Sequence, residues 1–155
     1  IGVDLYQHLL GAAIREARGE TVDDWAPVLN LGLGGRLPPE WIPEEELRVG
    51  LYLRLARIGD VAGLEAFEGE LADRFGELPE DAQRLLAIAR VRVLAGAAEV
   101  EKIDAGPAAI ALTMRQSASS SVVEKLGLEE ANGRLILREA TADAMERLAR
   151  VEGLL

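Results

Sequence analysis

The residues of this chain that could do chemistry are clustered carboxylates, one histidine and a short glycine-rich stretch. Neighbouring carboxylates occur at Glu44, Glu45 and Glu46, and again at Glu129 and Glu130. Such groups can act as general acids and bases or bind Mg²⁺. The first cluster stands where a helix is expected to begin, which the helix dipole favours, and the second flanks a predicted hairpin. Both clusters have a structural explanation, so we predict no catalytic residue, no metal site and no cofactor in this segment.

His8 and the glycine-rich stretch do not complete a known site either. His8 is the only histidine and the chain has no cysteine, so a triad or a two-histidine zinc site lacks its other members. We expect His8 to pair with Asp4, four residues earlier on a helix surface. The stretch NLGLGGRL at 30–37 lacks the third glycine of a dinucleotide fingerprint and the lysine of a phosphate loop. It predicts turns and no nucleotide site.

Charge and hydropathy restrict the partners. The net charge is −10, and residues 40–80 hold 11 acidic and 4 basic residues, a net −7. The only lysines are Lys102 and Lys125, whereas phosphate contacts need clustered basic residues. No apolar run reaches the roughly 20 residues of a membrane span, and the start lacks a secretory signal and an initiator Met. We predict a cytoplasmic piece of a longer protein, without direct nucleic-acid, membrane or small-molecule partners, whose protein partner would be basic.

Helical spacing dominates the first half of the chain. The four predicted helices cover residues 4–18, 43–58, 61–75 and 79–97. Pro43 and Pro79 suit first helical turns, Asp60 is an expected N-cap, and Gly19 and Gly76 are expected ends. In the second helix the predicted buried stripe is Leu47, Leu51, Leu55 and Ile58; the last helix is apolar on most sides and predicted to be central. A short strand is expected within 28–33, and Trp25 and Trp41 are expected to anchor the connecting segments.

The second half changes to strand patterns. Segments 100–106 and 109–115 predict strands around a Gly106-Pro107 turn, and Asn132-Gly133 predicts a hairpin. Residues 117–121 are either a flexible link or end in the cap of a short helix over 121–127. A last helix is expected over 141–152, with Ala144, Leu148 and Val151 inward. The predicted fold is α+β, one domain over 1–155, with a helical N-terminal half (1–98) packed with a small strand-rich C-terminal half (99–155).

One helix face combines acidic residues at regular spacing. At 100° per residue, the apolar residues of 61–77 cluster on one side and Glu70, Asp73 and Glu77 fall near the opposite side. Two interpretations stay open. The carboxylates are either an ordinary solvated surface or a docking site for arginines, because acids at i and i+3 project together.

Three segments resemble the C-terminal domain of the bacterial transcription-repair coupling factors (Mfd proteins, the TRCF domain). They are IGVDLYQHLLGAAIREARG, LPPEWIPEEELRVGLYLRLARI and ELADRFGELPEDAQRLLAIARVR. The last is the most specific, because the family shows EL-x-DRFG-x-LP before a leucine-rich helix. Residues 1–98 carry the resemblance; 99–155 follow only the family's order of strands and helices, and the stretch VDDWAPVLNLGLGGRLPPEW departs from its pattern.

The resemblance implies a function. The family's full protein is an ATP-driven double-stranded DNA translocase that displaces stalled RNA polymerase and recruits UvrA, with its motor outside this segment. Its C-terminal domain packs on the N-terminal UvrB-like module of the same chain and masks the UvrA-binding surface. Acidic side chains before RFG meet arginines there; the matching positions are Glu70 and Asp73, and the helical projection adds Glu77. We expect Glu70→Arg with Asp73→Arg to keep the fold and expose the UvrA site. The alternative is a general acidic interaction domain without autoinhibition.

Overall fold

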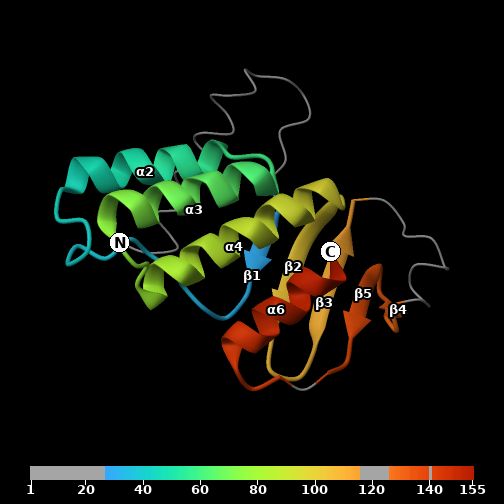
Figure 1. The fold of residues 1–155 in the computed structure, drawn as a ribbon. Helices are drawn as coiled ribbons and strands as arrows, with labels where there is room; N and C mark the ends of the chain where they lie inside the picture. Colours follow the sequence, from blue (N-terminus) through green and yellow to red (C-terminus); the bar gives the residue numbers. More distant parts are fainter. Residues whose placement is uncertain (1–26, 116–125, 140) are drawn as a thin grey trace. The chain divides into compact units, whose positions relative to one another are not determined.

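The computed structural model describes residues 27–115, 126–139 and 141–155 (Figure 1). The predicted helix over 4–18 with Asp4 and His8, Trp25, and the 117–121 segment with most of the short helix after it lie outside these residues. The chain divides into two compact units. One contains Gly34–Val93, and the other contains Leu94–Leu155 with the described part of Trp25–Leu33. Each unit is described by itself, and the single domain over 1–155 stays a prediction.

Three helices begin and end close to their predicted boundaries. They are α2 (Glu45–Arg57), α3 (Val61–Phe75) and α4 (Glu80–Ala97). The Asp60 side chain accepts a hydrogen bond of 2.6 Å from the Gly63 N–H, as expected of an N-cap. Gly76 ends α3 with a φ of +88°. Only a few residues separate α2 from α3, so the two form a helical hairpin (Figure 1).

The core of the first unit confirms α4 as an apolar helix and corrects the buried stripe of α2. Leu85 and Ala89 of α4 have no exposed surface. In α2, Leu51 and Leu55 are buried as predicted, but Leu47 and Ile58 are only half-buried. The other buried residues of α2 are Tyr52 and Ala56. Tyr52 can lie in the core because its hydroxyl accepts a hydrogen bond of 2.8 Å from the buried Leu37 N–H.

The connection from Gly34 to Glu44 lies against these helices. Gly35 is buried, and a Cβ atom there would lie 2.2 Å from the Leu85 backbone nitrogen. The indole N–H of Trp41 donates to the Phe75 carbonyl at 2.9 Å, and the two rings pack edge to face at 5.7 Å. This contact confirms Trp41 as an anchor and satisfies one of the last carbonyls of α3.

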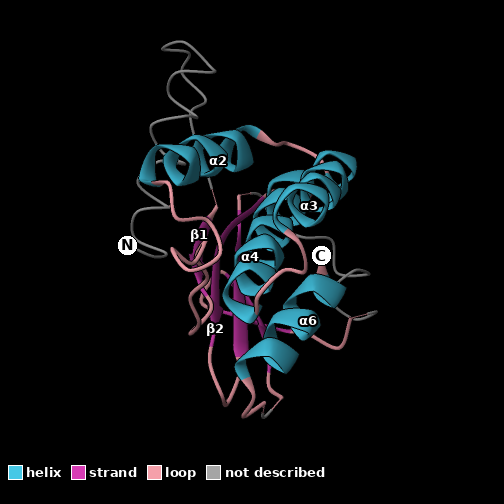
Figure 2. Ribbon diagram, turned by 60° about the vertical axis from the view of Figure 1, so that its left-hand side comes forward, coloured by secondary structure: helices cyan, strands magenta, loops and turns pink. Residues whose placement is uncertain are grey.

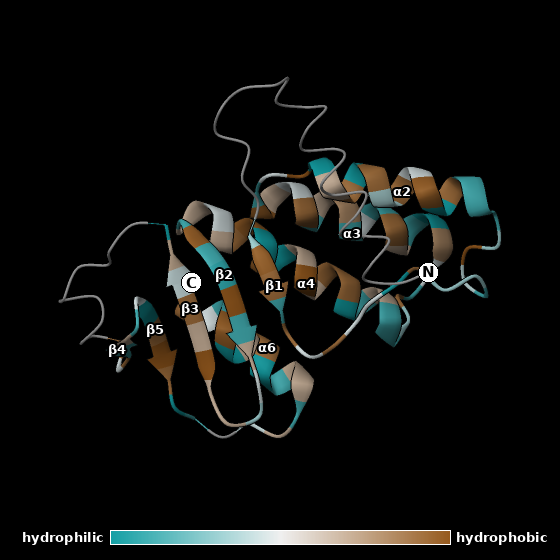
Figure 3. Cartoon of the chain, turned by 180° about the vertical axis from the view of Figure 1, so that it is seen from behind, coloured by the Kyte–Doolittle hydropathy of each residue, from teal (hydrophilic) through white to brown (hydrophobic). Residues whose placement is uncertain are grey.

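The second unit contains a five-stranded mixed sheet in the order β1-β2-β3-β5-β4. The strands are β1 (Val28–Asn30), β2 (Val100–Ala105), β3 (Ile110–Met114), β4 (Glu129–Ala131) and β5 (Arg134–Leu137). Among the strands of the described residues, only β1 is parallel to its neighbour, β2. From Lys102 to Ala105, polar and apolar residues alternate along β2 (Figure 3). The register aligns Ile103, Leu112 and Leu135 on one buried face. The prediction of an α+β fold is confirmed (Figure 2).

Predictions from short sequence motifs in the second unit are also confirmed. Asn132 and Gly133 have φ of +53° and +74°, the conformation of a type I′ turn between β4 and β5. The last helix, α6, covers Ala144–Leu154 rather than 141–152. Its N-cap is Asp143, which accepts a hydrogen bond of 2.9 Å from the Glu146 N–H. Leu148 and Val151 are buried as predicted, whereas Ala144 is half-buried.

The close approach at Gly35 predicts that Gly35→Ala destabilises the first unit. The added methyl group would collide with the backbone of α4, and such overpacking costs about 1–3 kcal/mol of unfolding free energy. Urea denaturation measures this loss. Gly69→Ala is the matched control, because Gly69 lies in α3 with no atom within 4 Å of its added Cβ. That variant should gain about 0.5–1 kcal/mol; equal effects of both variants would contradict the packing argument.

Candidate protein-interaction surface

The three predicted interface residues occupy different environments. Asp73 is exposed on the last turns of α3. Glu70 lies one turn earlier, and its side chain is 34% exposed. Glu77 is exposed but follows Gly76, where α3 has ended. The structure therefore places Glu70 and Asp73 on one helix, and Glu77 does not share their helical face.

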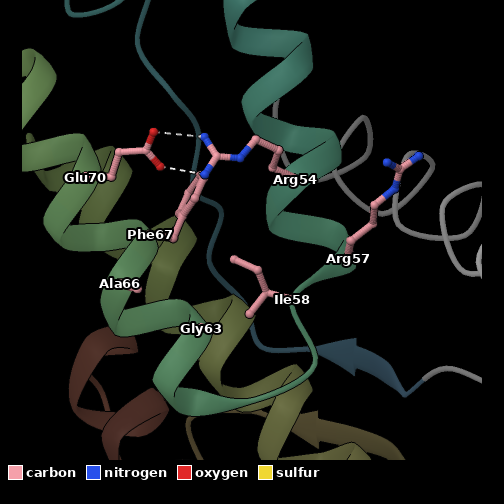
Figure 4. Close-up of a pocket in the computed structure, with 7 residues that line it drawn as sticks. All are labelled: Arg54, Arg57, Ile58, Gly63, Ala66, Phe67 and Glu70. Carbon is pink, nitrogen blue, oxygen red and sulfur yellow. Dashed lines mark hydrogen bonds and ion pairs between the residues drawn. The ribbon is translucent and has the colours of Figure 1, made fainter.

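Glu70 is held by two arginines of its own unit. Arg54 of α2 donates to both carboxylate oxygens, at 3.1 and 2.5 Å (Figure 4). Arg74, four residues further along α3, donates to Oε1 at 3.2 Å. The Arg54 guanidinium also lies over the Phe67 ring, 5.4 Å from its centre. Neither arginine contact was predicted from the sequence, although the i, i+4 spacing of Glu70 and Arg74 is a signal for such a pair.

These contacts keep the members of the Glu70 cluster, which are Glu70, Arg54 and Arg74, in their charged forms. The hydrogen bonds from Arg54, and then the one from Arg74, hold the pKa of Glu70 below its usual 4.5. The hydrogen bond to Glu70 in turn raises the pKa of Arg54 above its usual value. Glu70 is therefore a carboxylate with a fixed orientation at neutral pH.

Asp73 offers an open acceptor on the same side of α3. Within the described part of the chain its carboxylate makes no hydrogen bond or ion pair. Ala66, Glu70 and Asp73 follow one another at i, i+4 and i+7, a spacing that places all three on one helix face. This face, defined by Ala66, Glu70 and Asp73, is called the acidic face of α3.

A groove between α2 and α3 opens beside the acidic face. Its volume is about 310 Å³, and Glu70 with Arg54 stands at one end (Figure 4). The lining residues are Arg54, Arg57, Ile58, Gly63, Ala66, Phe67 and Glu70. In the parts that the structure describes, no three potential ligands gather into a metal site, and no described helix is long and apolar enough to cross a membrane.

The helices and the mixed sheet define an α+β fold. The chain belongs to the TRCF domain family, whose model matches residues 31–126. This match confirms the resemblance found in the sequence.

Curated relatives support the same family, and a solved structure has the same fold. The chain is 32% identical over 109 residues to the transcription-repair-coupling factor of Rickettsia bellii, which covers 68% of this chain and 10% of that protein. It is 36% identical over 121 residues to that of Mycobacterium tuberculosis, covering 70% and 10%. The chain thus spans about a tenth of these relatives. A crystal structure of the C-terminal domain of transcription-repair coupling factor shares its fold, with a TM-score of 0.68, 19% identity and coverage of 83% of this chain and 95% of that one.

The arginine contacts predict how the Glu70 cluster responds to acid. Because the pKa of Glu70 is lowered on folding, its stabilising contribution is present above 4.5 and is lost as the pH falls through the lower folded value. A double-mutant cycle of Arg54→Gln and Glu70→Gln should give a favourable coupling in the unfolding free energy at pH 7 that shrinks below about pH 4.5. A coupling that stays constant in acid would contradict the ion-pair assignment.

Proposed function

We propose that this chain is the regulatory C-terminal domain of a transcription-repair coupling factor, which docks on the UvrB-like module of its own protein. Docking would mask the surface that binds UvrA, and the motor of the proposed DNA translocase would lie outside this segment. The observation that carries this proposal is the acidic face of α3, where an open Asp73 lies one turn from the arginine-bound Glu70. The family match supports it.

The two carboxylates would contribute differently to docking. Asp73 can accept both N–H groups of an incoming guanidinium, the strongest arrangement for this pair. Glu70 already accepts three hydrogen bonds from Arg54 and Arg74, and a carboxylate has about four acceptor sites. It therefore has room for one further donor. Asp73 would be the principal contact, and Glu70 would provide a fixed second charge.

A contact of this kind suits a reversible latch. Exposed ion pairs are individually weak, so a few of them do not lock two modules together permanently. When both modules belong to one chain, the tether raises their effective concentration and favours the closed state. An event that holds the modules apart would then release the UvrA site without breaking a large interface.

Asp73→Arg should abolish docking while keeping the fold. The substitution reverses the charge of an exposed residue without a described partner, whereas reversal at Glu70 would place a third arginine beside Arg54 and Arg74. Calorimetric titration of this chain with the separately expressed UvrB-like module should show binding that weakens with salt and disappears in the variant. In the full protein, the same substitution should raise the affinity for UvrA.

Glu68→Arg provides the matched control. Glu68 is exposed on α3 but lies about 140° around the helix from Asp73, so the same charge change is made outside the acidic face. This variant should bind nearly as the unmodified chain does. Equal loss in both variants would indicate a general acidic interaction domain that responds to net charge, and no loss in either would exclude the acidic face.

A further inference from the structure

Arg147 of α6 is a buried cation whose partners are carbonyl groups. Its residue is only 6% exposed. Its Nε and Nη2 donate to the carbonyl of Thr141 at 3.3 and 2.9 Å, and Nη2 also donates to the carbonyl of Ala142 at 3.4 Å. No carboxylate of the described residues forms an ion pair with it. A buried charge without an opposite charge is costly, so the guanidinium still lacks a negative partner.

One nitrogen of this guanidinium is free. An arginine has five N–H donors, and the two on Nη1 take part in no hydrogen bond within the described residues. Nη1 also keeps some contact with solvent, since the fully buried unpaired side-chain nitrogens of the described chain are Nε of Arg84 and Nε of Arg90. Two donors are therefore available to an acceptor that comes from outside.

Gly32 keeps Nη1 open to such an acceptor. It is exposed, and a Cβ atom added to it would lie 3.0 Å from Nη1. Its φ of +72° is rarely adopted by residues with a side chain, so the backbone conformation itself favours the residue that leaves Nη1 uncovered. Outside the helices and strands of the described chain, the N–H groups of Gly32 and Leu33 donate no hydrogen bond. Backbone donors thus lie beside the free nitrogen.

The surroundings of Nη1 favour a negatively charged ligand. β1 and β2 are parallel and end at Asn30 and Ala105, just before Gly32 and beside it. Ligands commonly bind at the carboxyl ends of parallel strands. Arg147 lies in the first turns of α6, where the helix dipole is positive. The buried charge, the strand ends and the dipole together suit an oxyanion.

We propose that Nη1 of Arg147, beside Gly32, binds a single carboxylate of a partner protein, from an acidic side chain or a C-terminus. The charge of the chain selects this ligand over nucleic acid. The net charge is −10, and Asp143 and Glu146 lie on the same end of α6, so a row of phosphates would be repelled. One carboxylate needs only the few donors present. The site belongs to the second unit and does not depend on docking through α3.

Titration with sodium acetate, followed by the ¹H–¹⁵N resonances of this chain, tests the proposal. The Gly32 amide and the Arg147 Nε–H should shift and saturate in acetate, and should not do so in sodium chloride of equal ionic strength. Gly32→Ala should weaken acetate binding about tenfold or more, because its methyl group would cover Nη1. Gly133→Ala is the matched control: its φ is +74°, and no atom lies within 4 Å of the added Cβ. It carries the same backbone strain and should bind acetate as the unmodified chain does.

The outcomes decide the proposal. Equal shifts in acetate and chloride, saturation only at molar acetate, or unchanged binding in a folded Gly32→Ala variant would each overturn it, the second as an adventitious additive only. Binding of inorganic phosphate without binding of acetate would overturn the choice of a carboxylate. Thermal unfolding checks that each variant is folded. If Gly32→Ala is not, Arg147→Lys keeps the charge but removes Nη1, and its loss of acetate binding supports the site.

Discussion

A buried arginine of α4 holds the end of α2, and the arrangement of the helical unit depends on this contact. Arg92 is 8% exposed, and its Nη2 donates to the carbonyls of Leu55 at 3.2 Å and Ile58 at 2.8 Å. These carbonyls belong to the end of α2, where backbone acceptors lack helical partners and a positive charge is favoured. Ile58 is the C-cap of α2 and lies two residues before Asp60, the N-cap of α3. Arg92 thereby holds the turn between the two helices that carry Arg54 and Glu70.

The features that the sequence predicted are those encoded by adjacent residues. Asp60 and Gly76 mark the two ends of α3, and Asn132-Gly133 forms the turn between β4 and β5. Both were predictable because capping and turn conformations depend on one to four residues. The exposed position of Asp73 follows from helical periodicity in the same way. The Arg54–Glu70 pair joins residues 16 apart, and the parallel pairing of β1 with β2 joins residues 74 apart. No short sequence motif predicts either contact, since both depend on how whole helices and strands pack against one another.

The division of α3 into two sides relates its stability to its proposed role. Leu64 and Leu71 are buried on one side, so the helix is positioned by the core. On the other side the Glu70 carboxylate is oriented by arginines before any partner arrives. Groups ordered in advance lose less conformational entropy on binding. A small contact can therefore select its partner without binding it tightly. A reversible contact between modules of one protein requires this combination.

The position of β1 has a consequence for the order of folding. β1 pairs with β2, yet all of Gly34–Val93 lies between the two strands in the sequence. Joining them from an unfolded chain closes a loop of roughly 70 residues, whose entropic cost rises with the logarithm of its length. The helical unit needs no such closure, because its helices are consecutive. Once formed, it replaces most of the flexible loop with a compact body, so we expect β1 to join the sheet after the antiparallel strands β2, β3, β5 and β4 have paired.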